Sequence, residues 1–109
     1  MTLFTRNPAV MTVMLFCLAA PLQANDEGEA LYKACAACHG NQGQGNPQMS
    51  APSLAGMNKS YLERQLKHFK GNQRGSAPDD TLGAQMKAMT ATLTTDQSIE
   101  AVATYLSRL

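Results

Sequence analysis

Two cysteines and a histidine lie close together in the first third of the chain. In the segment YKACAACHG, two residues separate Cys35 from Cys38, and His39 follows directly. Thiolates and imidazoles bind metals, and thiols also form disulfides or bonds to cofactors. The pattern therefore allows four kinds of chemistry: a structural zinc site, a redox-active thiol pair, a plain disulfide, or covalent attachment of a cofactor.

Three of these alternatives fit the chain poorly. A zinc site needs two further thiols or imidazoles, but beyond residue 24 the only histidines are His39 and His68. Thioredoxin-like thiol pairs lie within a βαβ pattern, which this sequence lacks. A disulfide across so short a loop stabilises little and gives His39 no role.

Covalent attachment of a haem uses all three residues. In the pattern C-x-x-C-H, two thiols form thioether bonds to the haem and the histidine coordinates its iron. One helical turn separates the two sulfurs, so that both reach the porphyrin edge while the next residue projects under the ring. The sequence thus predicts one haem c with its iron, held by Cys35, Cys38 and His39.

Residues 1–24 have the layout of a secretory signal peptide. They carry one charge, Arg6, then an apolar run from Val10 to Ala20, and end on the small residue Ala24. The run is shorter than the roughly 20 residues that span a bilayer, so a cleaved signal is favoured over a retained anchor. We expect export to the periplasm, no permanent membrane span, and one domain over residues 25–109.

Without residues 1–24 the chain is formally neutral, because Arg6 leaves and eight basic residues then face eight acidic ones. This balance argues against nucleic acid as the main partner. A solvated helix face is the preferred interpretation of the basic stretch between residues 59 and 74, and a patch that steers an acidic partner is the alternative. The stretch contains Lys59, Arg64, Lys67, Lys70 and Arg74.

The two ends of this domain predict helices. Residues 26–38 begin with acids and continue with helix formers, with Asn25 or Asp26 as the cap. Residues 94–109 combine the capping-box spacing of Thr94 and Gln97 with an apolar stripe at helical spacing. The stripe consists of Ile99, Val102, Ala103, Leu106 and Leu109.

Residues 58–72, NKSYLERQLKHFKGN, predict a further helix that is capped at Ser60 and ends at Gly71. Glu63 and Lys67 have the spacing of an ion pair on one helix face.

Glycine, proline and amide residues predict long loops over residues 40–56 and 71–83. No segment alternates at the period of a β-strand. We therefore expect an all-α domain of three to four helices. A chain this short buries only a modest core, so a bound cofactor has to complete it.

The sequence resembles the small bacterial class I cytochromes c over the whole of residues 25–109. The resemblance is carried by the segments GEALYKACAACHG, APSLAG, YLERQLKHFKGNQR, MKAMTATLT and DQSIEAVATYLSRL. It implies the cytochrome c fold, in which three to four helices wrap around one covalently attached haem.

Family members carry a Pro-x-Leu-x-Gly segment after the haem motif, matched here by Pro52, Leu54 and Gly56. The resemblance implies that the Pro52 carbonyl accepts the second ring N–H of His39 and that Leu54 packs on the porphyrin. Such a hydrogen bond orients the imidazole and strengthens it as an electron-pair donor to the metal. A simple turn proline is the alternative.

The resemblance also implies a close crossing of the first and last helices. Gly28 and Tyr32 match the crossing point on the first helix, with Tyr105 as their contact on the last. Ordinary helix packing explains these residues equally well.

The second axial ligand of the iron is harder to assign. Met49 and Met57 lie in the loop that serves the His39 side, whereas Met86 and Met89 lie far enough downstream to reach the opposite face. In the family the ligand methionine lies a characteristic number of residues before the start of the last helix, which here is Leu93-Thr94. This distance implies Met86 in preference to Met89. His68 is expected to be exposed in mid-helix.

These features predict a periplasmic electron-transfer protein, not an enzyme, with His39 and Met86 on the iron. Its partners would be redox proteins such as an oxidase, a reductase or a dehydrogenase. The alternative is a haem subunit or small haem enzyme whose open or displaceable sixth position acts on a small ligand.

Overall fold

The computed structural model describes residues 2 and 23–109. This part of the chain contains four α-helices. They are α1 (Gln23–His39), α2 (Lys59–Lys70), α3 (Thr81–Thr90) and α4 (Asp96–Ser107). A short 3-10 helix, Pro47–Met49, interrupts the loop after α1, and these residues contain no β-strand beyond an isolated bridge. The predicted all-α architecture is confirmed.

None of the described helices is long and apolar enough to cross a membrane. The predicted signal peptide, residues 1–24, lies almost entirely outside the described residues and stays a prediction.

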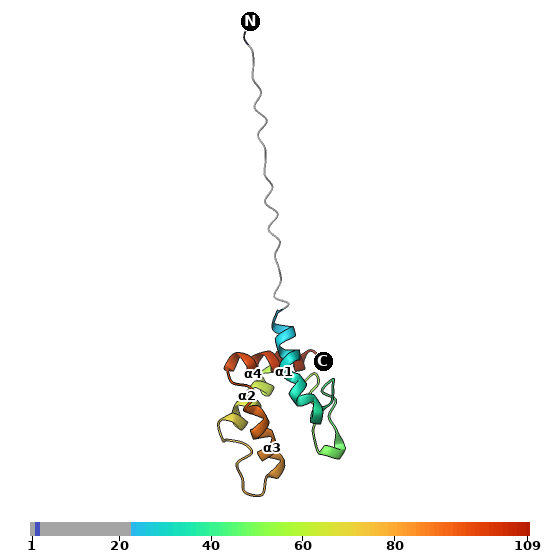
Figure 1. Cartoon of the computed structure of the whole chain (residues 1–109), viewed down its shortest axis with the longest axis vertical. Coiled ribbons are helices and arrows are strands. Elements are labelled where there is room, and N and C mark those ends of the chain that lie inside the picture. The colour runs from blue at the N-terminus through green and yellow to red at the C-terminus, as the bar shows by residue number, and fades with distance from the viewer. Residues whose placement is uncertain (1, 3–22) are drawn as a thin grey trace.

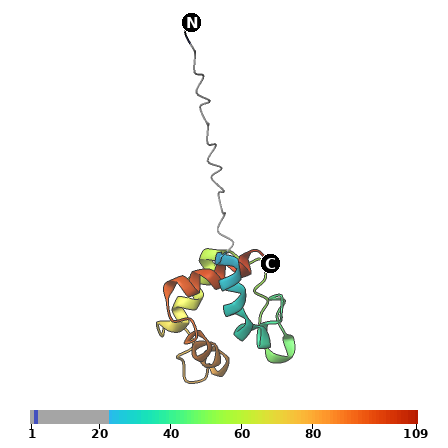
Figure 2. The same cartoon turned by 45° about the horizontal axis from the view of Figure 1, so that its top comes forward.

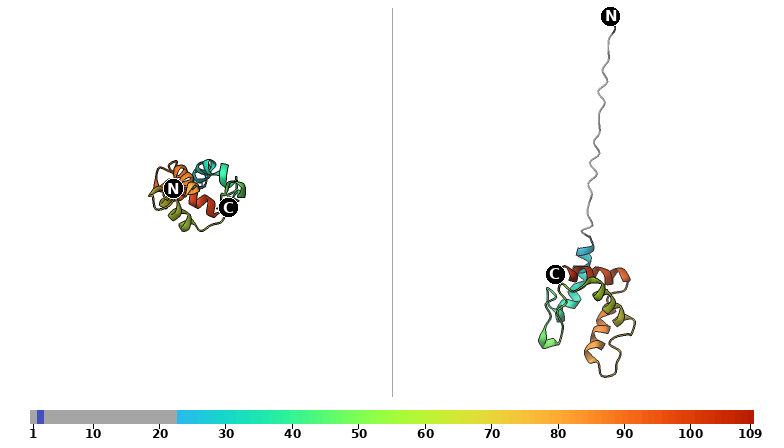
Figure 3. Two further views of the ribbon diagram at one scale, coloured as in Figure 1. Left: turned by 90° about the horizontal axis from the view of Figure 1, so that it is seen from below. Right: turned by 180° about the vertical axis from the view of Figure 1, so that it is seen from behind.

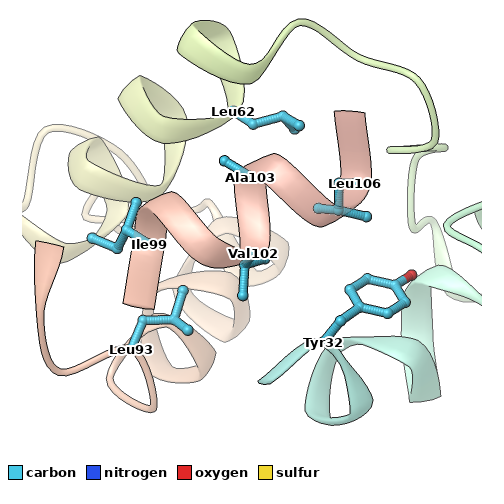
Figure 4. Packing of buried hydrophobic residues seen from close by; sticks show 7 residues of the cluster. All are labelled: Tyr32, Leu62, Leu93, Ile99, Val102, Ala103 and Leu106. Carbon is cyan, nitrogen blue, oxygen red and sulfur yellow. The ribbon is translucent and has the colours of Figure 1, made fainter. Parts of the chain in front are cut away.

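Helix α4 forms the centre of the core, with α1 crossing it and α2 packing beside it (Figures 1 and 2). Figure 4 shows the side chains of α4 between Leu62 of α2 and Tyr32 of α1. The apolar stripe predicted for the last helix is therefore its buried face, except at the exposed Leu109. The buried cluster contains Tyr32, Leu62, Leu93, Ile99, Val102, Ala103 and Leu106.

The crossing of α1 and α4 requires a residue without a side chain at Gly28. A Cβ atom there would lie 2.3 Å from the carbonyl oxygen of Ala101, far inside van der Waals contact. The rings of Tyr32 and Tyr105 meet beside this point, with centroids 5.6 Å apart. The Tyr32 hydroxyl donates a hydrogen bond of 2.6 Å to the Gly40 carbonyl, which holds the start of the loop against the core.

Three helix starts differ from the prediction. Helix α1 begins at Gln23, so Asn25 and Asp26 lie inside it and are not its cap. At the other two starts a different residue is the cap. Asn58, not Ser60, caps α2, because its side chain accepts a hydrogen bond from the Tyr61 N–H at 3.1 Å. The capping box of α4 joins Thr95 and Ser98, one residue later than predicted. In both places the residue with extended or non-helical backbone carries the capping oxygen, which sequence spacing alone does not identify.

Helix α3 begins inside the segment predicted as a loop. Asp80 starts it by accepting the N–H of Gly83 at 2.8 Å, so Gly83 lies within the helix and not in the loop. A side chain at Gly83 would collide with the Asp80 carboxylate, so the glycine leaves room for the cap.

The loop between α1 and α2 folds back on itself. Asn46 pairs with Ala51, and a Cβ atom on Gly45 would lie 2.7 Å from the Ser53 nitrogen. Gly45 also has a φ of +82°, a conformation that favours glycine. The crowding that excludes a side chain at Gly45 therefore comes from the chain itself.

The expected ion pair of Glu63 and Lys67 is not formed. Glu63 lies 3.6 Å from Lys59, which also binds Glu100 at 2.8 Å, and Lys67 turns to Asp96 at 3.8 Å. Two lysines of α2 therefore connect this helix to the first turns of α4. These pairs are exposed, so they contribute little to stability.

The Gly28 contact predicts that Gly28→Ala destabilises the protein by about 1–3 kcal/mol, because the added methyl group is forced into the α4 backbone. Urea unfolding of the haem-loaded protein measures this change. Glu29→Ala, at an exposed neighbouring position, is the control and stays within about 0.5 kcal/mol. Helix propensity alone predicts the opposite sign, a gain of roughly 1 kcal/mol for Gly28→Ala, and that result would contradict the close crossing.

Candidate functional site

His39 is the last residue of α1, and its side chain is only 4% exposed. Its Nδ1 atom lies 2.9 Å from the Pro52 carbonyl oxygen. A carbonyl only accepts hydrogen bonds, so the ring hydrogen of a neutral imidazole is on Nδ1. The backbone carbonyl of His39 accepts the Gly45 N–H at 2.7 Å. These two hydrogen bonds hold the loop against His39. The Nε2 atom is left with a free lone pair.

The Nε2 atom of His39 faces the sulfur of Met86 at 3.5 Å. Met86 is half-buried on α3, and the two residues come from opposite sides of one cavity. Since the ring hydrogen is on Nδ1, two electron-pair donors point at each other with no hydrogen between them. Two such donors are suited to serve as ligands of one metal ion.

For the other candidate axial ligands the described residues show no such approach to His39. Met89 lines the same cavity but is 40% exposed, and Met49 is also exposed at the cavity edge. Met57 packs against the core, and His68 lines neither of the two cavities described below. His68 is half-buried, not exposed as expected, because the chain after α2 turns back and donates two backbone N–H groups to its carbonyl.

Cys35 and Cys38 lie on the last turns of α1, where both line the cavity that contains His39. They are not joined to each other, and both are half-exposed. Burial raises the pKa of the Cys35 thiol, and the neighbouring Cys38 raises it further. The spacing of one helical turn presents both sulfurs to the same space.

Two adjoining cavities, of about 130 and about 500 Å³, share the His39 and Met86 side chains as lining. Pro52 and Leu54 also line both of them, so the loop forms one wall and α3 the opposite one. The view from behind in Figure 3 shows the loop and α3 on either side of the helix crossing. Cavities of this combined size hold cofactor-sized ligands.

The donor set does not fit zinc. Among the described residues no group of three or more His, Cys, Asp or Glu side chains could hold a metal ion. The further thiolates or imidazoles of a structural zinc site are therefore missing around Cys35 and Cys38.

The site does fit a haem. It offers two thiols at the edge of a cleft, one buried imidazole, one facing thioether, and mainly apolar walls. The walls include Leu54, Leu66, Leu82, Val102 and Leu106. Each chemical part of a haem c site is present on this chain.

Comparison with known proteins agrees with this geometry. The family described as Cytochrome c matches residues 25–109. The chain belongs to the cytochrome c family. The cofactor is accordingly a covalently attached haem c with its iron, and Cys35, Cys38 and His39 match the C-x-x-C-H attachment motif. Cytochromes c carry electrons between redox partners on this haem.

Relatives of this cytochrome c include proteins of different lengths. It is 40% identical over 76 residues to the thiosulfate dehydrogenase electron acceptor of Thiomonas intermedia (strain K12), covering 70% of this chain and 31% of that protein. It is 34% identical over 84 residues to cytochrome c4 of Stutzerimonas stutzeri, covering 75% and 39%. It is 27% identical over 104 residues to cytochrome c-553 of Nitratidesulfovibrio vulgaris (strain DSM 19637 / Miyazaki F), covering 93% and 92%.

The chain thus spans less than half the length of the first two relatives and almost the whole of the third. Its own part is one haem-binding unit of this family.

Sequence reasoning missed several residues of the cytochrome c site. Leu82 on α3 lines both cavities and is exposed. Arg74 and Asp80 line the larger cavity. The helical spacing of residues 58–72 indicated that Leu66 is on the apolar face of its helix. Nothing in the sequence indicated that Leu82 and Arg74 line the same cavity as His39.

Covalent attachment through both cysteines predicts that acid–acetone treatment leaves the haem on the protein and that the pyridine haemochrome spectrum is of c type. Cys35→Ala and Cys38→Ala each lose one thioether bond, and we expect little stable haem-loaded protein from either. Lys33→Ala, on an exposed position of the same helix, is the control and keeps wild-type yield. Haem that extracts freely from the wild type would disprove covalent attachment.

Proposed function

We propose that this cytochrome c is a periplasmic electron carrier in which His39 and Met86 are the two axial ligands of the iron. When bound, the haem supplies a one-electron Fe(II)/Fe(III) couple. The chain's residues hold that couple, exclude water from it and set its potential.

The approach of His39 Nε2 to Met86 Sδ, at 3.5 Å, is the observation that supports this proposal best. The Pro52 carbonyl fixes the ring hydrogen on the far nitrogen, so both facing atoms are electron-pair donors. Both residues would therefore be available to hold the iron. A thioether opposite an imidazole favours reduced iron and raises the potential, as suits a carrier.

A haem enzyme acting on a small ligand is the rival function, and it needs an open or easily displaced sixth position. Met86 argues against it, because its sulfur lies directly opposite the imidazole and its helix is capped at Asp80. With His39 and Met86 both on the iron, no coordination position would be open to a substrate.

The name of one relative, an electron acceptor of thiosulfate dehydrogenase, supports a role in receiving electrons from a dehydrogenase. An oxidase or a reductase would take the electron onward. The signal-like residues 1–24 support export to the periplasm, and the family match starts directly after them.

Electron exchange is proposed at the exposed apolar edge of the cleft. Met49, Leu82 and Met89 are large exposed side chains, and all three line the smaller cavity. No lysine, arginine, aspartate or glutamate among the described residues lines that cavity. This apolar rim excludes water and needs no opposite charge on its partner.

The basic stretch on α2 is a poor steering patch. Lys67 lies 3.8 Å from Asp96, and Lys70 donates to the Leu93 carbonyl. These contacts support the solvated-face interpretation of the stretch over the acidic-partner alternative.

The ligand assignment predicts different results for two neighbouring methionines. Met86→Ala abolishes the iron–sulfur charge-transfer band of the ferric protein, lowers the midpoint potential and lets cyanide bind, because the sixth position opens. Met89→Ala, the matched control one helical turn away, keeps the band, since that side chain is already 40% exposed. Loss of the band in Met89→Ala alone would place the ligand there, and high-spin iron in the wild type would favour the haem enzyme.

We expect that a charged residue introduced at the apolar rim slows electron self-exchange between copies of the protein. Leu82→Glu lowers the rate of electron exchange between ferrous and ferric copies by about tenfold, because like charges then meet in the encounter. Added salt restores part of the rate, whereas the wild-type rate depends little on salt. NMR line broadening in mixed samples measures both rates.

Leu109→Glu is the matched control, because Leu109 is similarly exposed but lines neither cavity. Equal rates for Leu82→Glu and Leu109→Glu would show that electrons leave by another surface.

A further inference from the structure

One buried hydroxyl outside the two cavities is bonded to the peptide next to the haem histidine. Tyr32 lies on α1, about two helical turns before His39, and is only 2% exposed. The packing of its ring on Tyr105 explains the aromatic group but not the hydroxyl, since a phenylalanine would pack there too. That hydroxyl donates to the carbonyl of Gly40, the residue after His39, at 2.6 Å.

The Gly40 carbonyl accepts a second hydrogen bond from the loop. The Gly43 N–H donates to it at 3.2 Å, the long end of the range for such bonds. The Tyr32 hydroxyl therefore makes the shorter of the two bonds to this carbonyl. Gly43 is buried and has a φ of +67°. The turn of residues 40–43 is thus held from the side of the core by the phenol.

The Gly43 carbonyl extends this connection to the segment that follows Pro52. It accepts the Leu54 N–H at 2.7 Å and the Ala55 N–H at 3.0 Å. The Ser53 hydroxyl also donates to it, at 3.2 Å. One carbonyl of the first turn thus fixes the residues directly after Pro52.

Pro52 is the last member of this set of contacts. It has no N–H group that could anchor it to a neighbour, so its position depends on the residues around it. Its carbonyl oxygen lies 2.9 Å from Nδ1 of His39. A continuous set of hydrogen bonds therefore connects the Tyr32 hydroxyl, through the peptides of Gly40 and Gly43, to the imidazole.

We propose that Tyr32 is a positioning residue for the axial imidazole: its hydroxyl holds the loop that supplies the Pro52 carbonyl, and thereby sets how strongly His39 donates to the iron. The inference rests on the proposed function, in which His39 is an axial ligand. A hydrogen bond from Nδ1–H makes the other ring nitrogen a stronger electron-pair donor. That bond weakens steeply when its geometry is lost, so the position of the loop matters.

The charge of the iron gives the sign of the effect. A stronger imidazole donor stabilises ferric iron more than ferrous iron, because ferric iron carries the larger positive charge. Without the Tyr32 hydroxyl, the Gly40 carbonyl keeps only the longer bond from Gly43, and the loop opens more often. The hydrogen bond between His39 and Pro52 is then weaker on average. The midpoint potential therefore rises.

The test measures the midpoint potential and the amide hydrogen exchange of haem-loaded wild type and Tyr32→Phe. The phenylalanine keeps the ring and removes only the hydroxyl. Tyr105→Phe is the matched control, because it removes a hydroxyl from the same ring pair, and the described residues show no hydrogen bond from that hydroxyl to the loop. Gly28→Ala controls for stability, because it strains the same helix crossing and leaves the Tyr32 hydroxyl in place.

We expect a higher midpoint potential in Tyr32→Phe than in wild type. Hydrogen exchange at the Gly43 and Leu54 amides becomes faster by about fivefold, the factor that corresponds to the loss of one neutral hydrogen bond. Exchange within α2 stays unchanged. Tyr105→Phe and Gly28→Ala keep the wild-type potential.

An unchanged potential in Tyr32→Phe would overturn the proposal, even if exchange in the loop becomes faster. A rise of the same size in Gly28→Ala or Tyr105→Phe would also overturn it, because the effect would then come from helix packing. The NMR spectrum of the ferric wild type separates these outcomes from failure of the proposed function. Iron-shifted imidazole signals with an unchanged potential in Tyr32→Phe reject Tyr32 alone, whereas their absence from the wild type rejects His39 as the ligand and both proposals with it.

Discussion

The hydrogen bond between the His39 imidazole and the Pro52 carbonyl is the contact on which the site depends. At 2.9 Å it fixes the ring hydrogen on Nδ1 and turns Nε2 towards the cleft. The loop that supplies the carbonyl is itself anchored to the His39 backbone through Gly45. A rotation of the imidazole would therefore break a loop contact, and this makes the ring a rigid ligand and not a mobile side chain.

The packing of the helices positions the two sides of the site. Gly28 lets α1 cross α4 so closely that the end of α1, with its thiols and imidazole, is held against the core. Helix α3 is attached mainly through α2 and brings Met86 to the opposite side. Apolar side chains from the loop, α2, α3 and α4 line the cleft between these parts. A small helical domain thus gains through its cofactor the interior that its own side chains do not fill.

Charge is distributed unevenly around this interior. The lysines of α2 are used to tie that helix to α4 and to the turn before it, through Glu100, Asp96 and the Leu93 carbonyl. The rim at Met49, Leu82 and Met89 is left apolar, and Arg74 alone brings a permanent positive charge to the cleft within the described residues. Under our proposed function the protein exchanges electrons at this apolar rim.

The sequence by itself determined the covalent chemistry, because C-x-x-C-H places three reactive groups within about one helical turn, and local spacing is what a sequence records. It also predicted the helical class from periodicity, since the buried face of α4 follows from an apolar stripe. Tertiary structure decided the rest. Asp80 starts α3 inside a glycine-containing segment, and only the folded chain shows that Met86 and Arg74 meet the space beside His39. These residues lie dozens of positions from the haem motif, and their approach depends on how α2 and α3 pack, which no local pattern encodes.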